Sequence, residues 1–296
     1  MPARAKRIIP ATERIDRTER CDLARAGGPR VNWQVGTIPF VKASACGNDF
    51  LLIDGALAPE DIAAFTRRIC DRHNGVGADG VEWMVPHFSA DVEIKLINAD
   101  GSAAEISGNG TRCVAAYICE QAGKERISIL TGAGLKICVL TARNESEYEF
   151  EIEMGEAVVE NELALKMAGG EVHGIPVSIG NPHYVSFVTE FPSNWQEYAA
   201  EIQRNARFQH GVNVEFVAVD SKHDLRARFF ERGVGETRSS GTGSCASAMA
   251  AIATGRALSP VKVHAPGGTQ TIRTNDSKVF LRGPARLLCR GEFFTS

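Results

Sequence analysis

One arrangement occurs twice in this chain: a Ser-Gly-x-Gly segment that leads directly into a helix of small residues. The first copy is Ser107-Gly108-Asn109-Gly110, before the stretch 114–122, and the second is Ser240-Gly241-Thr242-Gly243, before the stretch 246–255. Glycine lets successive backbone N–H groups point at one spot, and a helix N-terminus adds the positive end of its dipole. Each copy is therefore predicted to bind an anion such as a carboxylate or a phosphate.

The elements around the two copies follow the same order. Strands and one helix come first, then Ser-Gly-x-Gly with its helix, and then more strands. Both small-residue helices are apolar or small on nearly every face, which indicates that they are buried inside a curved sheet. We expect a mixed α/β fold of two pseudo-twofold-related halves, each a curved, mostly antiparallel sheet wrapped around a central small-residue helix. A cleft between such halves is a common ligand site.

Hydrophobic periodicity places the remaining elements. Apolar alternation and short buried runs predict strands at residues 37–42, 50–54, 81–85, 91–98, 127–130, 135–141, 147–154, 172–179, 213–219, 225–230, 261–265, 269–274, 278–282 and 285–289. Helices are predicted at 59–70 and 195–205. The segment 75–80 has the spacing of a dinucleotide-binding loop but follows a helix and opens a strand, the reverse of that motif, so we interpret it as a tight turn.

Charge and cysteine content exclude several classes of protein. A net charge of -3 over 296 residues gives no electrostatic reason to expect nucleic acid, and no apolar run approaches the roughly 20 residues of a membrane span. The eight cysteines form no CxxC pair, which favours reduced cytoplasmic thiols over a disulfide framework. Cys70 and His73 alone are too few for a structural zinc site, so we expect no metal. Residues 1–36, basic and without apolar periodicity, are expected to be a disordered extension.

Several separated motifs carry a resemblance to a known family: Lys42, Gly47-Asn48-Asp49-Phe50, Asp71-Arg72-His73-x-Gly75-x-Gly77, Asn98-Ala99-Asp100-Gly101-Ser102, Gly108-Asn109-Gly110-x-Arg112-Cys113, Gly180-Asn181-Pro182-His183, Asn213-Val214, Glu231-Arg232-Gly233 and Gly241-Thr242-Gly243. From about Pro39 to its end, the chain resembles the cofactor-independent diaminopimelate epimerases. The resemblance implies interconversion of LL- and meso-diaminopimelate in lysine and peptidoglycan biosynthesis, with no cofactor, by a cytoplasmic protein that is commonly a homodimer. We expect residues 37–152 with 283–296 to form the N-terminal domain, and 153–282 the C-terminal one.

The resemblance implies two groups of substrate-binding residues. The first would hold the distal amino acid end and the polar arms of the substrate: Asn48, Asn98, Asn181, Asn213, Glu231 and Arg232. The second would bind the carboxylate at the reacting carbon: Gly108, Asn109, Gly241 and Thr242. The second group coincides with the two predicted anion sites, where paired helix N-termini would stabilise the negative charge that develops on deprotonation.

The chain departs from the family at the two positions that transfer protons. The family's chemistry needs one thiol on each face of the α-carbon, and this chain has Ser107 and Ser240 there. A thiol pKa of about 8.5 can be lowered by a helix N-terminus, whereas a serine hydroxyl is a much weaker acid that needs a neighbouring base. His183 is the candidate in the sequence for that base. Cys113 and Cys245 match noncatalytic family cysteines further along each helix.

Three interpretations of the serines stay open. They are a Cys→Ser change in an ordinary epimerase, a natural relative in which Ser, helped by His183, transfers protons more slowly or differently, and a noncatalytic amino acid binding protein. Another cofactor-free amino acid isomerase of the same fold is a further alternative. We expect little α-proton exchange with solvent as the chain stands, and restored exchange with cysteine at both positions. Taken alone, both serines fit helix N-caps, and Arg112 is expected to be a structural salt-bridge partner.

Overall fold

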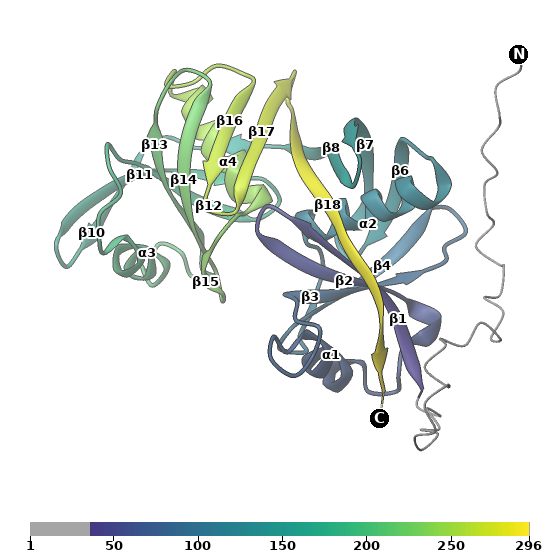
Figure 1. The fold of residues 1–296 in the computed structure, drawn as a ribbon. Coiled ribbons are helices and arrows are strands. Elements are labelled where there is room, and N and C mark those ends of the chain that lie inside the picture. Colours follow the sequence, from purple (N-terminus) through teal and green to yellow (C-terminus); the bar gives the residue numbers. More distant parts are fainter. Residues whose placement is uncertain (1–35, 296) are drawn as a thin grey trace, which may run out of the picture. The chain divides into compact units, whose positions relative to one another are not determined.

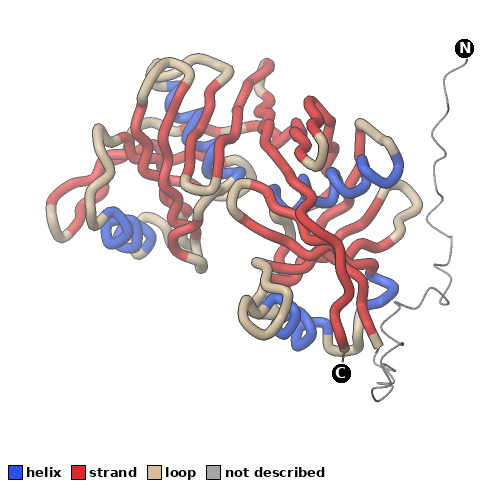
Figure 2. The backbone as a smooth tube through the Cα atoms, in the orientation of Figure 1, coloured by secondary structure: helices blue, strands red, loops and turns tan. Residues whose placement is uncertain are grey.

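The computed structural model describes residues 36–295, and Thr37–Thr295 form one compact unit. The expectation of a disordered segment falls on residues that, except for Gly36, lie outside the described part. Strands are the main element of the fold, and helices are few (Figure 2). No helix in residues 36–295 is both long and apolar enough to cross a membrane.

The first repeat of elements runs to residue 156. Its helices are α1 (Ile62–Cys70) and α2 (Gly108–Ala122), with a 3-10 turn, η2, at Gly55–Leu57. Its strands are β1 (Thr37–Ala45), β2 (Asn48–Asp54), β3 (Gly80–Val85), β4 (Val92–Asn98), β5 (Ala103–Ala104), β6 (Arg126–Thr131), β7 (Gly134–Asn144) and β8 (Glu147–Glu156).

The second repeat continues to the end of the described chain. Its helices are α3 (Trp195–Gln203) and α4 (Gly241–Ala253). Its strands are β9 (Val158–Val159), β10 (Leu163–Met167), β11 (Gly170–Ser178), β12 (Pro182–Phe187), β13 (Asn213–Val219), β14 (Asp224–Glu231), β15 (Gly235–Thr237), β16 (Val261–Ala265), β17 (Gly268–Asn275) and β18 (Lys278–Phe294). The hairpin formed by β10 and β11 begins before the predicted strand 172–179 and was not expected from the sequence.

Strand pairing confirms the two related halves. In the first, β2 pairs parallel with β3, β3 antiparallel with β4, and β4 parallel with β6. In the second, β12 pairs parallel with β13, β13 antiparallel with β14, and β14 parallel with β16. The hairpins that follow, β6 to β8 and β16 to β18, also correspond. Residues in equivalent register positions can therefore be compared directly.

The two small-residue helices are buried, as predicted. The buried side of α2 includes Cys113, Val114 and Ala116, which pack in one core with β2, β4, β6 and β8. The helix α4 packs in a second core with β11, β13, β14 and β16, and Ala248 and Ala250 are fully buried there. Small side chains let the surrounding strands approach each helix closely, and each core belongs mainly to one half.

The prediction of two separate strands at 278–282 and 285–289 was wrong, because β18 is continuous. It pairs first with β17 and β8 and later with β1, and it crosses the molecule as the long yellow strand of Figure 1. Pairing with β17 ends at Arg282 and pairing with β1 begins at Arg286. Gly283 and Pro284 therefore have a ladder partner only in β8. A proline is tolerated in a strand where one side needs no hydrogen bond.

Candidate functional site

Each of the two serines caps a helix. Ser107 precedes α2 in an extended conformation, and its Oγ accepts a hydrogen bond from the backbone N–H of Gly110 at 3.1 Å. Ser240 precedes α4 in the same conformation and accepts from the N–H of Gly243, also at 3.1 Å. These are N-cap geometries, which satisfy one of the free amides of a helix start. The two helix tips are thus built alike.

The side chain of Asn109 connects the two tips. Its Nδ2 donates to Asn48 Oδ1 at 2.7 Å and to Ser239 Oγ at 2.8 Å. Asn109 lies in the first turn of α2, and Ser239 directly precedes Ser240 at the start of α4. The structure therefore brings the beginnings of α2 and α4 side by side. Because the Asn109 amide is already engaged, only its backbone N–H remains for an anion.

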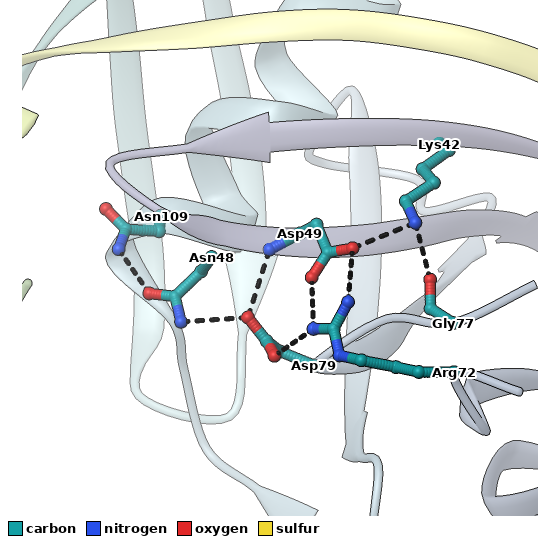
Figure 3. A network of polar contacts seen from close by, with 7 residues as sticks. All are labelled: Lys42, Asn48, Asp49, Arg72, Gly77, Asp79 and Asn109. Atoms are coloured by element: carbon teal, nitrogen blue, oxygen red, sulfur yellow. Dashed lines mark hydrogen bonds and ion pairs between the residues drawn. The ribbon is translucent and has the colours of Figure 1, made fainter. Parts of the chain in front are cut away.

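A charged network holds Asn48 in place (Figure 3). Asn48 Nδ2 donates to Asp79 at 3.0 Å, and Arg72 bridges Asp79 and Asp49 with contacts of 2.7 Å to each. Lys42 lies 2.9 Å from Asp49. Burial of Asp49 opposes its charge, but hydrogen bonds from Arg72 and Lys42 outweigh it and hold the pKa of Asp49 below its usual value. The network fixes the position of Asn48 from behind.

Beside the tip of α4, His183 is the centre of a buried polar cluster. Its Nδ1 lies 2.7 Å from Glu215 Oε1 and its Nε2 lies 3.0 Å from Asn181 Oδ1. Asn181 Nδ2 in turn donates to Thr242 Oγ1 at 3.4 Å, in the first turn of α4. Burial raises the pKa of Glu215, and the neighbouring imidazole partly offsets that rise. The cluster joins β12, β13 and the tip of α4.

The carboxylate of Glu231 accepts a hydrogen bond from the hydroxyl of Ser240. Burial raises its pKa, while a hydrogen bond from the Ser240 hydroxyl and the charge of His183 lower it in part. Ser240 is itself 5% exposed. The hydroxyl at this tip therefore has a carboxylate that can take its proton, which a serine needs to act as a base.

Three of the other predicted residues are linked less directly to the tips. Asn213 accepts from the backbone N–H of Arg232 at 3.0 Å and donates to Pro182 O, so it fixes the end of β14 beside β12. The guanidinium of Arg232 is exposed and donates to His210 O. Asn98 donates to Ser102 Oγ within its own turn, and no hydrogen bond in residues 36–295 joins it to another predicted site residue.

The two glycines of the predicted carboxylate site open their helices. Gly108 and Gly241 are the first residues of α2 and α4, and both are partly exposed. Neither has a side chain to cover its N–H group. The backbone at both tips is therefore accessible to a small anion.

The cysteines near the serines do not replace them. Cys113 and Cys245 are fully buried in the two cores, and burial raises the pKa of both thiols. A buried neutral thiol is neither a good base nor accessible to a ligand.

Arg112 is fully buried but forms no ion pair within the described chain, so the expectation of a structural salt bridge was wrong. Its guanidinium donates to the carbonyls of Pro284 and Gly108, each at 3.1 Å, and to Asn109 Oδ1. Carbonyl oxygens of α2 and β18 thus take the place of an acid. Arg112 fixes the amide of Asn109, which the sequence did not suggest.

Glu82 of β3 was not expected from the sequence to belong to the site. It is fully buried, and neither carboxyl oxygen has a hydrogen-bond partner. A Cβ added to Gly110, in the first turn of α2, would collide with Glu82 Oε1. The signal in the sequence was an acid inside an otherwise apolar strand. By contrast, two surface hollows, one beside Glu160 and Arg207 and one beside Asp61 and Arg68, contain none of the predicted site residues.

Comparison with known proteins shows the family. The diaminopimelate epimerase family model matches residues 40–160 and 175–288. A diaminopimelate epimerase of Pelotomaculum thermopropionicum is 36% identical over 274 residues, covering 86% of this chain and 98% of the relative. One from Desulfitobacterium hafniense is 35% identical over 273 residues, covering 85% and 96%.

A solved structure shows the same fold at lower identity. The probable proline racemase of Agrobacterium radiobacter K84 superposes with a TM-score of 0.68 at 16% identity, covering 88% of this chain and 93% of that protein. The family match, the close relatives and the two capped helix tips agree. The chain belongs to the diaminopimelate epimerase family and is an amino acid epimerase of that type.

Proposed function

We propose that this protein interconverts LL- and meso-diaminopimelate and that Ser107 and Ser240 stand where protons leave and reach the α-carbon. The observation that carries the proposal is the meeting of two serine-capped helix starts, joined through Asn109 and Ser239. Diaminopimelate epimerases align with this chain over nearly their whole length, which supports diaminopimelate as the substrate. We further propose the two domains as 37–152 with 283–296 and 153–282, in a homodimer.

The substrate carboxylate at the reacting carbon binds to the backbone N–H groups of Gly108, Asn109, Gly241 and Thr242. Helix starts favour negative charge, and the charge on this carboxylate grows when the α-carbon loses its proton. Donors already in place stabilise that growth without rearrangement. The polar arms and the distal amino acid end of the substrate contact Asn48, Asn98, Asn181, Asn213, Glu231 and Arg232.

Proton transfer proceeds on two faces of the carbon. On the α4 side, Ser240 exchanges a proton with the substrate while Glu231 takes or returns the hydroxyl proton. His183, held by Glu215 and Asn181, lies near Glu231 and partly offsets the rise that burial causes in the pKa of Glu231. On the α2 side, Ser107 faces the opposite side of the carbon. Serine is a weaker acid than cysteine, so this turnover is slow.

Binding is tested by thermal unfolding with added ligand. Diaminopimelate should raise the melting temperature, because a ligand that binds only the native state stabilises it by about 2.7 kcal/mol at a concentration 100 times its Kd. Lysine, which lacks the second carboxylate, serves as the matched control and should give a smaller shift. No shift with millimolar diaminopimelate would count against the substrate.

A noncatalytic amino acid binding protein is the second candidate, because hydroxyls replace both expected thiols. Exchange of the substrate α-proton in deuterated water separates the two: an epimerase exchanges it slowly and a binding protein does not. We place the activity in the cytoplasm, since the seven cysteines of the described chain are all free thiols, as is usual in a reducing compartment.

A further inference from the structure

Two buried glutamates occupy matching places beneath the two helix tips. In the parallel pair β2 and β3, Leu52 is opposite Glu82; in the equivalent pair β12 and β13, Val185 is opposite Glu215. Each glutamate lies against the glycine of the first helical turn. A Cβ on Gly243 would lie 2.9 Å from Glu215 Oε1, and a Cβ on Gly110 would collide with Glu82 Oε1. The fold repeat thus places one carboxyl group behind each serine-capped tip.

The surroundings of the two carboxyl groups differ. Glu215 has His183, which is opposite Asn213 in the register of β12 and β13. The equivalent position in β2 is Phe50, opposite Gly80, and a phenyl ring offers no hydrogen bond. Glu82 is therefore left with two unpartnered oxygens in a fully buried place. A buried polar group without partners costs stability and calls for an explanation.

Ser107 lies beside the same glycine as Glu82, and its hydroxyl can donate the hydrogen bond that Glu82 lacks. The Ser107 oxygen accepts from Gly110 N–H, and its hydroxyl proton has no acceptor among the described residues. The same Cβ position on Gly110 that would collide with Glu82 Oε1 lies 3.3 Å from Ser107 Cβ. A donor without an acceptor and an acceptor without a donor thus lie around one glycine.

We propose that Glu82 is the positioning residue of the α2 side: it accepts the hydroxyl proton of Ser107 when that serine removes the α-proton of the substrate. The inference rests on the proposed function and adds a base that the family resemblance does not provide. Glu82 thereby accepts the hydroxyl proton of Ser107 as Glu231 accepts that of Ser240.

The proton balance is simple. The Cα–H bond of the substrate breaks and its proton moves to Ser107 Oγ, while the former hydroxyl proton moves to the Glu82 carboxylate. The electron pair left on the α-carbon spreads into the substrate carboxylate, which the helix tips hold. Ser240 then delivers a proton to the opposite face, and Glu231 supplies the replacement. The reverse direction runs the same steps backwards, so no oxidant or other reactant is needed.

Burial raises the pKa of Glu82 to about 8. A carboxylate with such a pKa is a stronger base than an exposed one and is matched to a pH near neutrality. Of the charged or titratable groups packed around it, Cys113 on α2 is close enough for the Glu82 charge to act on it. The facing residues of β2 and β4, Leu52 and Leu96, are apolar. The basic form of Glu82 therefore appears as pH rises through about 8.

The test is α-proton exchange in deuterated water, measured separately from LL- and from meso-diaminopimelate by NMR. In Glu82→Gln, exchange should fall by roughly 100-fold from the stereoisomer that Ser107 deprotonates and much less from the other. The rise of that rate toward pH 8 should disappear. Thr66→Val, which removes another buried unpartnered group from α1, is the matched control and should change neither rate.

A second variant tests the link between the two residues. If Glu82 acts through Ser107, Glu82→Gln should have no further effect in a Ser107→Ala background. Equal loss from both stereoisomers or full additivity of the two changes would each overturn the inference. The thermal shift with diaminopimelate should persist in Glu82→Gln. A parent protein that shows no such shift, or no exchange from either stereoisomer, contradicts the proposed function instead, so the two failures are distinguishable.

Discussion

The tips of α2 and α4 have the same backbone construction and different polar partners. In both, a serine caps the helix, a glycine follows three residues later and a buried glutamate lies against that glycine. At α4 the carboxylates are engaged, Glu215 with His183 and Glu231 with Ser240. At α2 the carboxyl of Glu82 has no partner.

The fold repeat therefore fixes where the polar groups lie but not whether they are charged. Asn98 pairs with Gly80 across β3 and β4. Glu231 directly follows Phe230, which pairs with Val214, so the same register continued by one residue makes Glu231 the counterpart of Asn98. One half therefore has an amide where the other has an acid. An epimerase must treat two mirror-related faces of one carbon, and unlike tips suit unlike stereoisomers.

The largest effect should come from restoring sulfur at both tips. Ser107→Cys with Ser240→Cys should speed α-proton exchange by roughly 100-fold or more, because a thiol with a pKa of about 8.5 ionises far more readily than a hydroxyl. Exchange in deuterated water followed by NMR measures it.

The single variants Ser107→Cys and Ser240→Cys separate the roles of the two tips. Each cysteine alone should accelerate exchange from one stereoisomer, a different one for each position. A double variant no faster than the parent would mean that the serines do not occupy the proton-transfer positions. Cys138→Ser, a change at a buried thiol of β7, is the control and should leave exchange unaltered.

The two buried glutamates should respond oppositely to replacement by leucine. Glu82→Leu should stabilise the protein by about 2 kcal/mol, because it removes an unpartnered buried carboxyl and fills the same space. Glu215→Leu should destabilise it by about 3 kcal/mol, because it leaves His183 buried without its partner. Urea unfolding of both variants measures the difference. A loss of stability in both would show that Glu82 has a partner in solution.

The pH dependence gives the Glu82 comparison a second readout. In the unfolded chain Glu82 has the ordinary glutamate pKa of 4.5, whereas burial in the folded chain raises its pKa to about 8. Between these values the folded state binds more protons, so this group makes the parent less stable as pH rises. The advantage of Glu82→Leu should therefore grow by at most about 1.4 kcal/mol per pH unit in that window. It should level off above pH 8.

Much of this arrangement followed from the sequence. The repeated Ser-Gly-x-Gly segments predicted both helix starts, and the small residues after them predicted burial; both are confirmed. Local pattern identified these features because capping and periodicity act within a few residues. The same local patterns predicted two strands separated at Gly283-Pro284. The continuity of β18 there is evident only from its pairing with neighbouring strands.

The partners of the buried charged residues could not be predicted from local sequence patterns. Glu82 and Glu215 each interrupt an apolar strand, yet whether each has a partner depends on β2, β12 and the helix tips, which are distant in the chain. The absence of a salt bridge at Arg112 has the same origin, because carbonyl groups of Pro284 and Gly108 accept its hydrogen bonds. Sequence indicates that a buried charge needs a partner but not which group supplies it.

The smallest effect should come from removing each hydroxyl. Ser107→Ala should cost about 1 kcal/mol of stability, the usual value of an N-cap, because its oxygen bonds only to Gly110. Ser240→Ala should cost more, about 2 kcal/mol, because it also removes the hydrogen bond to the buried carboxylate of Glu231. Ser→Asn at each position preserves a capping oxygen and separates the two contributions: it should restore most of the stability at 107 and less at 240. Equal losses of stability in Ser107→Ala and Ser240→Ala would mean that the hydrogen bond between Ser240 and Glu231 adds no stability. The two tips would then differ only in their buried glutamates, Glu82 and Glu215.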